Sequence, residues 1–396
     1  MISFKFSDHC CGCGACADAC PKKCISIVND SFGVRIPKID VASCVGCGKC
    51  EVVCPVLNVF RVRFENRQLY CAFNKDEQDR EKGSSGSVFF ALAQYVISKR
   101  GIVYGAGFDG NLKLRHTKAE NELDLAALCK SKYLQSDTTG CFSDVKKQLN
   151  EGKTVLFVGT PCQCQALRNF VGLQNAKDLI LTDLICHGVP GQELFDKYIH
   201  SYEIKNKCKV LSFSFRIKKN YGEENVDMNH YRICYQTGSG ELKEEISPYM
   251  NSSFYSGFKK YYPFRKSCYE CRFVGSDRVS DLTIGDFWNL EKIDNSVKDF
   301  YKGYSMVVVN SEKGKTVLKG IQEKVELRPM DNSLLLHNNE AYRKPTTKNA
   351  IQYVFRWCYT FMPYDLLEKI FFENDHPKLR MFLRKSGRKV ASLLKL

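Results

Sequence analysis

The sequence lacks any uninterrupted apolar run of the roughly 18 residues that a membrane-spanning helix needs, so we expect no transmembrane segment. Its first residues, MISFKFSDHCC, do not form the basic stretch followed by an apolar stretch that marks a secretory signal. No C-x3-C-x2-C triplet is present, which removes the usual anchor of radical S-adenosylmethionine chemistry. These absences predict a protein of the reducing cytoplasm.

Cysteine, by contrast, is abundant, with 21 among 396 residues. In a short secreted chain this content would indicate disulfides, but this chain is long and its densest cysteines have the short spacings of metal ligands. Apolar residues make up 44% of the chain and charged residues 26%, which is ordinary for a globular protein. The length allows two or three domains, each with its own core.

Two four-cysteine runs repeat with an offset of 34 residues and the same C-x2-C-x2-C-x3-C-P spacing. Such short loops gather sulfur atoms around a cubane cluster, and the fourth cysteine of each run ligates the cluster of the other run. We therefore expect two [4Fe–4S] clusters, the first held by Cys10, Cys13, Cys16 and Cys54, the second by Cys44, Cys47, Cys50 and Cys20. Residues 1–60 are predicted to be an α+β module of the bacterial two-cluster ferredoxin type.

Zinc is the alternative occupant, but zinc sites usually combine two cysteine pairs, and the doubled run with a closing proline in each copy favours iron–sulfur clusters. Gly12, Gly14, Gly46 and Gly48 would let backbone amides approach the cluster sulfides and raise the reduction potential. Two further cysteines of this region, Cys11 and Cys24, fall outside the spacing. We interpret them as structural or spare.

The remainder of the chain alternates helix and strand patterns. Residues 61–82 are charged and turn-rich and are predicted to be a linker. For residues 83–335 we expect an α/β domain with a mixed, partly parallel sheet. Its predicted segments are helix Ser87–Lys99, strands Ile102–Gly105 and Leu112–His116, helix Leu123–Lys130, strand Thr154–Val158, helix Gln163–Phe170, strand Leu179–Ile185, helix Glu193–Lys205 and a strand–helix–strand at Ser305–Leu327. Residues 336–396 form an aromatic, basic tail that the pattern does not place.

Two cysteines of this domain, Cys162 and Cys186, each lie just past a buried-strand pattern. Ligands collect at the carboxyl ends of strands in open sheets. A later C-x2-C pair, Cys268 and Cys271, would complete a set of four with them. By spacing alone the pair could equally be half of a zinc site, or all four thiols could simply be buried.

Iron–sulfur clusters move single electrons, and a flavin is a group that converts these to two-electron chemistry. Two segments offer small or polar residues for it. In the first, Ser84, Ser85, Gly86 and Ser87 precede an apolar helix, whose free amides suit a pyrophosphate, although an ordinary serine cap explains the same pattern. In the second, Ser131–Ser136, the side chain of Lys132 could pair with phosphate and that of Tyr133 could stack on a ring, with Ser131 and Ser136 at the two ends.

A glycine pattern at Gly105–Gly110 matches the G-x-G-x-x-G nucleotide fingerprint. The fingerprint requires a helix directly after it, whereas Leu112–His116 alternates like a strand. We interpret the segment as a glycine-rich hairpin.

Several short motifs of this sequence resemble those of the beta-subunit family of coenzyme F420 hydrogenases and dehydrogenases. These motifs are GTPCQ (Gly159–Gln163), ICHG (Ile185–Gly188), CYEC (Cys268–Cys271), SDLTIGDFW (Ser280–Trp288) and SKYLQS (Ser131–Ser136). The resemblance runs from the ferredoxin module to about Arg328. It implies that Cys162, Cys186, Cys268 and Cys271 bind a third [4Fe–4S] cluster beside FAD, with Cys164 as the nearest rival to Cys162.

Together these features predict an oxidoreductase that passes electrons from ferredoxin or another redox partner protein, through the clusters, to FAD and a small organic substrate. Polar candidates for catalysis are His187, Asp281, Asp286 and Arg265, although an aspartate beside a strand is often a cap or turn residue. Members of the family act in several pathways, polysaccharide biosynthesis among them, so the resemblance does not supply the substrate. The rival is a non-enzymatic electron-transfer subunit of a larger complex.

The formal net charge of +15 falls to roughly +9 if three ligated clusters carry about −2 each. Much of the excess lies at Pro377–Leu396, which has seven Lys or Arg and no acidic residue. A peripheral contact with an anionic membrane would use this tail, whereas the plainer interpretation is a solvated helix. No nucleic-acid-binding motif accompanies the charge, so we expect no nucleic-acid partner.

Overall fold

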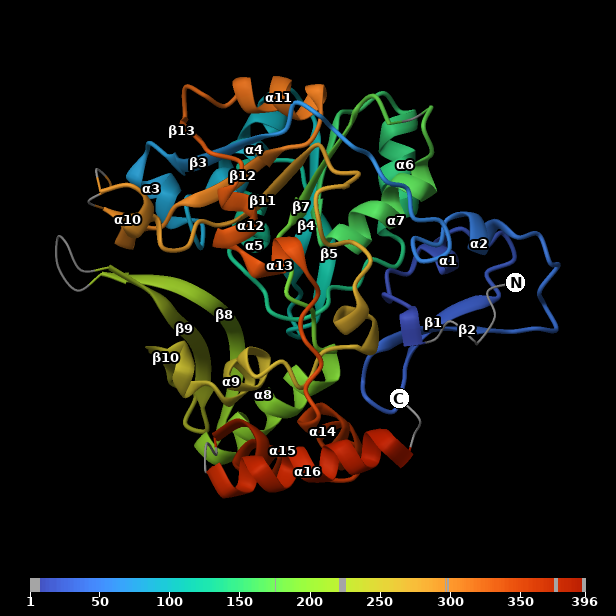
Figure 1. Ribbon diagram of the computed structural model, residues 1–396, viewed down its shortest axis with the longest axis vertical. Coiled ribbons are helices and arrows are strands. Elements are labelled where there is room, and N and C mark those ends of the chain that lie inside the picture. The colour runs from blue at the N-terminus through green and yellow to red at the C-terminus, as the bar shows by residue number, and fades with distance from the viewer. Residues whose placement is uncertain are drawn as a thin grey trace.

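The computed structural model describes residues 8–174, 176–220, 226–295, 297, 299–373 and 377–393. Its centre is an eight-stranded mixed sheet (Figure 1). In sheet order the strands are β13 (Val325–Met330), β3 (Gln68–Asn74), β12 (Ser305–Val309), β11 (Leu282–Asp286), β7 (Leu179–Leu184), β6 (Val155–Gly159), β4 (Ile102–Phe108) and β5 (Leu114–Ala119). The four strands β4, β6, β7 and β11 run parallel, and the outer strands pair antiparallel. The predicted mixed, partly parallel sheet is confirmed.

Helices cover both faces of this sheet, which is why its parallel strands are mostly apolar. Every residue of β6 is buried. One face packs against α4 (Val88–Ser98), α5 (Glu122–Leu128) and α11 (Glu312–Lys319). The other packs against α6 (Cys141–Asn150) and α7 (Pro161–Val171). A capping box formed by Thr160 and Gln163 starts α7 at once, so the chain turns sharply at the carboxyl end of β6.

The elements expected from sequence periodicity lie within a few residues of their predicted bounds. The glycine-rich segment after β4 is a hairpin, since β4 pairs antiparallel with β5. The predicted linker at residues 61–82 is wrong. It contains β3, which lies inside the sheet between β13 and β12, and α3 (Glu77–Glu81). Leu69, Cys71 and Ala72 are buried there, but charged flanks on both sides mask the short strand pattern.

The N-terminal module holds the hairpin of β1 (Ile25–Asn29) and β2 (Arg35–Ile39) and the short helices α1 (Ala15–Asp18) and α2 (Lys49–Val52). It lies beside α6 and α7 at one edge of the molecule (Figure 1). Asp18 accepts hydrogen bonds from the backbone of Gly140 (2.7 Å) and Ser143 (3.3 Å), so a carboxylate of the module caps the start of α6.

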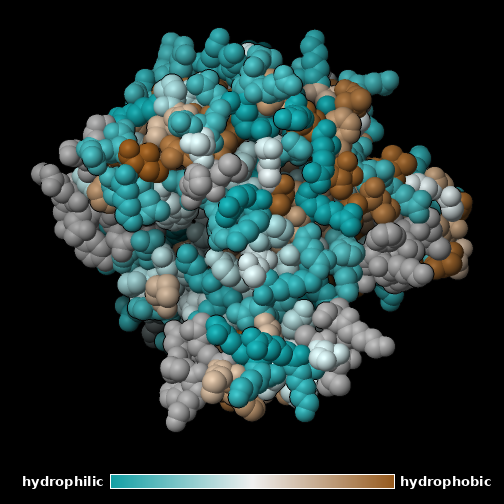
Figure 2. Space-filling view, in the orientation of Figure 1, coloured by the Kyte–Doolittle hydropathy of each residue, from teal (hydrophilic) through white to brown (hydrophobic). Residues whose placement is uncertain are grey.

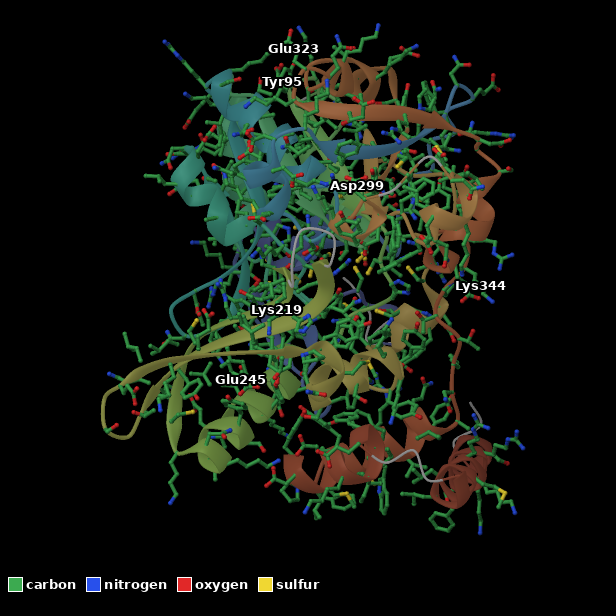
Figure 3. All side chains as sticks on the ribbon, turned by 90° about the vertical axis from the view of Figure 1, so that its left-hand side faces the viewer. Tyr95, Lys219, Glu245, Asp299, Glu323 and Lys344 are labelled. Carbon is green, nitrogen blue, oxygen red and sulfur yellow. The ribbon has the colours of Figure 1, made fainter. Side chains whose placement is uncertain are left out.

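A second layer lies below the main sheet, where Lys219 and Glu245 in Figure 3 mark its three-stranded antiparallel sheet. Its strands are β8 (Cys208–Asn220), β9 (Val226–Thr237) and β10 (Leu242–Pro248). The helices around it are α8 (Gln192–Asn206), α9 (Ser253–Lys259), α14 (Ile351–Tyr359), α15 (Tyr364–Leu367), the π-helix η5 (Glu368–Glu373) and α16 (Pro377–Leu393). The remaining short helices are η2 (Tyr249–Asn251), η3 (Lys266–Glu270), α10 (Leu290–Ile293), η4 (Phe300–Lys302), α12 (Leu334–Asn338) and α13 (Glu340–Arg343).

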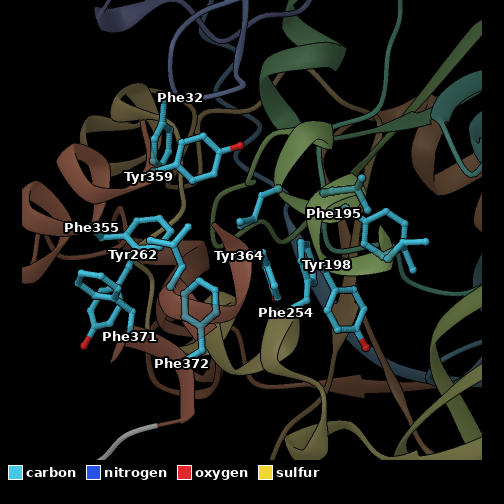
Figure 4. Close-up of a cluster of buried hydrophobic side chains, with 14 of the residues drawn as sticks. Phe32, Phe195, Tyr198, Phe254, Tyr262, Phe355, Tyr359, Tyr364, Phe371 and Phe372 are labelled. Atoms are coloured by element: carbon cyan, nitrogen blue, oxygen red, sulfur yellow. The ribbon is translucent and has the colours of Figure 1, made fainter. Parts of the chain in front are cut away.

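The C-terminal tail is an integral part of this layer. Its aromatic side chains pack into a buried cluster with α8, α9 and the strands β8 and β9 (Figure 4). The cluster also contains Phe32 of the N-terminal module, whose ring lies 4.9 Å from that of Tyr359 and 5.8 Å from that of Phe355. The tail therefore helps to hold the module in place. None of the described helices combines the length and the apolar character that a bilayer-spanning segment needs.

Candidate iron–sulfur and flavin site

The eight cysteines of the N-terminal repeat form two groups, as their spacing predicts. Cys20 lines a small cavity together with Cys44, Cys47 and Cys50 of the other run. In the other group, burial and the nearby thiols of Cys10 and Cys54 raise the pKa of the Cys16 thiol to about 12. Each group thus receives its fourth cysteine from the opposite run, which is the crossed pattern of two-cluster ferredoxins.

A cavity of about 350 Å³ opens at the carboxyl ends of the parallel strands. Its wall includes the residues that follow β6 and β7, the end of β11, and part of β4. This is the place where open α/β sheets bind their ligands. Both segments that the sequence suggested for a flavin contribute to the wall: Ser84, Ser85 and Ser87 from the first, and all six residues of Ser131–Ser136 from the second.

The four cysteines Cys162, Cys186, Cys268 and Cys271 also line this cavity, although they lie on three distant segments. Burial, and then the thiols of the other three, raise the pKa of Cys186. Cys164 points elsewhere: its sulfur lies 3.6 Å from the carbonyl oxygen of Thr182 inside the core, and it is absent from the cavity wall. Of these two rivals on α7, Cys162 faces the cavity and Cys164 faces the core.

Within the described residues, no three His, Cys, Asp or Glu side chains are arranged around a single metal ion. A cubane cluster makes a different demand, because iron and sulfide atoms stand between its thiolates. Soft thiolates in a group of four suit iron–sulfur or zinc chemistry.

Cys11 connects the two regions, so of its two interpretations, structural or spare, its position fits the structural one. It is buried, lines the cavity, and has hydrogen-bonding contacts with both Cys13 and Cys162. No spacing rule would have found it, because its partner lies in another domain. Cys24 behaves similarly at the other group, where its sulfur lies 3.4 Å from that of Cys20 and lines the same small cavity.

The Gly83–Ser87 loop presents an open helix end to the cavity. Ser87 does not cap α4; its hydroxyl donates instead to the carbonyl of Asp79 (2.6 Å), which leaves the first amides of α4 without a side-chain acceptor. Ser84 accepts a hydrogen bond from the backbone of Ser131 (2.8 Å) and so joins the two predicted segments. Lys218 supports the loop from behind by donating to the carbonyl of Ser85 (2.7 Å).

Gly86 does not face the cavity. A Cβ atom there would lie 2.2 Å from the carbonyl oxygen of Ala72, so only glycine lets this loop pack against β3. Nearby, the buried guanidinium of Arg80 pairs with Asp299 (2.9 Å; Asp299 is labelled in Figure 3) and donates to the carbonyl of Gly303 (2.9 Å).

The Ser131–Ser136 segment contributes one cation and one relay of hydrogen bonds. Burial lowers the pKa of Lys132 to about 7, and its ammonium donates to the carbonyls of Ala127 (3.0 Å) and Cys129 at the end of α5. Tyr133 is packed edge-on against Tyr255, with ring centroids 5.2 Å apart, and against Phe215. Tyr133 and Tyr255 therefore form an aromatic part of the cavity wall.

Ser136 belongs to a buried relay that sequence reasoning missed. Its hydroxyl donates to Nδ1 of His116 (2.8 Å) and accepts from Nε2 of Gln163 (3.0 Å). Nε2 of His116 donates to the carbonyl of Val158 (3.0 Å), and burial lowers the pKa of His116 to about 4. The imidazole is neutral, with its proton on Nε2. Gln163 belongs to the GTPCQ motif. The alternating pattern that predicted the strand, by contrast, gave no sign that His116 takes part in the site.

Of the predicted catalytic residues, His187 and Asp286 line the cavity. The His187 ring is stacked 6.4 Å from that of Tyr261, and burial, then the charge of Lys259, lowers its pKa. Asp286 is paired with the buried Arg216 at 2.6 Å. Both are held at the end of the cavity that the second layer closes.

The other two catalytic candidates have structural positions. Asp281 lies outside the cavity wall, where it accepts from the backbone of Leu181 (2.9 Å) and the hydroxyl of Ser311 (2.6 Å) and so ties β7 to the start of α11. Arg265 reaches the wall, but its guanidinium donates to the carbonyls of Cys10 (2.8 Å) and Arg35 (2.9 Å). We correct both expectations: Asp281 joins a strand of the sheet to α11, and Arg265 binds the N-terminal module to the large domain.

Comparison with known proteins agrees with this geometry. Residues 9–58 match the model of the 4Fe-4S dicluster domain. Residues 152–333 match the model that describes the C terminus of the coenzyme F420 hydrogenase/dehydrogenase beta subunit. The chain is therefore an iron–sulfur protein with a dicluster module, and its residues 152–333 belong to the F420 hydrogenase/dehydrogenase beta-subunit family. The resemblance seen in the sequence motifs is confirmed.

Among solved structures, the chain is similar to one from the F420-reducing [NiFe] hydrogenase complex of Methanosarcina barkeri, studied by xenon derivatization. The two share 15% identity over 85% of this chain and 94% of the other, with a TM-score of 0.43. No curated protein matches the chain.

Proposed function

We propose that this chain is an iron–sulfur flavoprotein oxidoreductase, which takes electrons from a redox partner protein such as ferredoxin through [4Fe–4S] clusters to FAD and a small organic substrate. One observation carries the proposal: a single cavity is lined at once by four convergent cysteines, by an uncapped helix end and by an aromatic wall. Bound FAD would supply the conversion between one-electron and two-electron chemistry.

The residues present fit these groups. Cys162, Cys186, Cys268 and Cys271 offer a third [4Fe–4S] cluster four soft ligands on the side of the cavity that faces the N-terminal module. The start of α4 offers amides and the positive end of a helix dipole to a pyrophosphate. The catalytic candidates that remain are His187 and Asp286, placed where an organic substrate would lie against Tyr261. A role in polysaccharide biosynthesis stays a prediction.

The alternative is an electron-transfer subunit that serves a catalytic partner, and the family description as a beta subunit supports it. Anaerobic quantitation of iron, sulfide and flavin separates the two. The proposed enzyme should contain about twelve iron atoms and one flavin per chain, and its flavin should bleach with reduced ferredoxin. About eight iron atoms would remove the third cluster. Full clusters without flavin would support the relay subunit.

Lys132 gives the flavin proposal a pH test. Because burial lowers its pKa to about 7, the ammonium loses its proton as pH rises from 6 to 8.5 and ceases to attract phosphate. We expect the dissociation constant of FAD to rise about tenfold or more over this range, the size of one charged hydrogen bond. Riboflavin, which has no phosphate, should show no such rise. The substitution Lys132→Met should flatten the FAD profile; an unchanged profile would place the pyrophosphate elsewhere.

A further inference from the structure

The internal repeat of the N-terminal module allows its two halves to be compared residue by residue. With the 34-residue offset, Cys11 corresponds to Val45 and Asp18 to Val52. The two cluster-binding loops have the same backbone conformation, since Gly12 and Gly46 have φ values of 66° and 68°. Differences between the halves therefore reflect what covers each one.

The first half is covered by the large domain. The carbonyls of its cluster loop accept hydrogen bonds from large-domain side chains: Cys10 from Arg265 and Ser267, Cys11 from Gln135, and Cys13 from Thr138. A Cβ atom on Gly12 would meet Nη1 of Arg265 at 2.5 Å. The first half therefore faces the large domain on the side of the cavity thiols, where Cys11 contacts Cys162.

The corresponding face of the second half is open. Val45 is 61% exposed and Val52 is 66% exposed, and Val41 beside them is 60% exposed. Within the described part of the chain, Cβ atoms on Gly46 and Gly48 would meet no atom within 4 Å, and Cys47, a predicted cluster ligand, is itself exposed. Apolar side chains are visible on this module in Figure 2. An apolar patch over an exposed cluster loop is characteristic of an interaction surface.

Basic side chains border this patch. Lys22, Lys23 and Lys49 are exposed next to the cysteines of the second group. The acidic residues nearby are Asp40 and Glu51. Asp40 accepts a hydrogen bond from the hydroxyl of Ser43 (2.6 Å), which lowers its pKa and keeps it charged. Because three lysines outnumber these two carboxylates, the rim carries net positive charge and is complementary to an acidic protein.

We propose that Val41, Val45 and Val52, with the lysines around them, form the docking surface for a small acidic one-electron carrier protein. The inference rests on the proposed function and adds to it the surface at which electrons enter the protein. One electron leaves the reduced carrier, which is oxidised, and reduces the second cluster; no bond forms or breaks and no proton moves. The equivalent face of the first half shows how this module accommodates a protein partner, because the large domain already occupies it.

The test uses the anaerobic full-length chain with an acidic bacterial two-cluster ferredoxin as the probe and reduced methyl viologen as a small reductant that needs no docking. The test variant carries Val45→Asp and Val52→Asp together. The control variant carries Leu242→Asp alone, at an exposed apolar residue of β10. Bleaching of the iron–sulfur absorbance is followed by stopped flow, so the readout does not depend on flavin or substrate.

We expect the double variant to need at least about tenfold more ferredoxin for half-maximal bleaching rate, while its rate with methyl viologen and its iron content stay unchanged. Lys22→Glu with Lys23→Glu should weaken the ionic-strength dependence of the ferredoxin rate. An unaltered ferredoxin dependence in the double variant would overturn the docking surface. A homodimer in ultracentrifugation that the double variant dissociates and Leu242→Asp does not would overturn it as well. A chain with about eight iron atoms and no flavin would contradict the proposed function but not the docking surface. The surface would still be tested, because ferredoxin would still bleach the N-terminal clusters.

Discussion

Replacing Cys268 with alanine is expected to lower the iron content from about twelve to about eight atoms per chain. The substitution removes one of four thiols that line the cavity, and a cubane with an open corner is readily lost. The N-terminal clusters should remain, since their ligands lie in another module. Bleaching of the flavin by reduced ferredoxin should then fall by at least about a hundredfold, because the carrier between module and cavity is gone. Iron analysis, low-temperature EPR and stopped-flow absorbance measure the three effects.

Two neighbouring thiols provide matched controls. Cys164→Ala removes the rival thiol of α7, which points into the core, and Cys11→Ala removes the buried thiol between Cys13 and Cys162. Both variants should retain about twelve iron atoms. Loss of about four atoms in either one, with full iron in Cys268→Ala, would show that the ligand set is assigned wrongly.

Substituting Asp183 with asparagine is expected to destabilise the large domain by about 3–5 kcal/mol. Its carboxylate accepts from the guanidinium of Arg278 (3.1 Å) and from the hydroxyl of Ser280 (2.9 Å), and both members of the ion pair are almost completely buried. Without the carboxylate, the Arg278 cation would remain in the interior without its counter-charge, which costs far more than the pair contributes. The midpoint of anaerobic chemical denaturation measures the change.

An exposed pair serves as the comparison. Glu241 lies 3.1 Å from Lys243 on the surface of the second layer, and Glu241→Gln should change stability by less than about 1 kcal/mol. The double substitution Asp183→Asn with Arg278→Met should recover much of the loss, because it removes the stranded charge together with its partner. Equal destabilisation by the single and double substitutions would mean that packing, and not the buried charge, dominates.

Much of the fold was predictable from periodicity, since buried parallel strands such as β6 are apolar throughout and helices such as α7 begin with clear capping signals. The failure at residues 61–82 has a specific cause. β3 is inserted between β12 and β13, strands from the far end of the domain, so its burial depends on partners more than 200 residues away and not on its charged flanks. The aromatic tail was unplaced for the same reason.

The candidate site divides in a similar way. Spacing identified the four cavity cysteines as candidates, but it could not tell which of Cys162 and Cys164 faces the cavity. Two positions so close on one helix differ only in which face meets the sheet. Arg265 illustrates the converse: the sequence offered it as a polar candidate for catalysis, whereas in the structure its guanidinium donates to carbonyls of the N-terminal module.

The sequence by itself determined the chemistry of the N-terminal module, because a cluster-binding run is local and its ligands lie within a few residues of one another. It also determined the α/β class and the family that residues 152–333 match. Only the tertiary structure decided that the four distant cysteines share a cavity with both suggested flavin segments, that Cys11 joins the two regions, and that one half of the module is covered while the other is open. Those relations are contacts between residues far apart in the chain, and no local pattern encodes them.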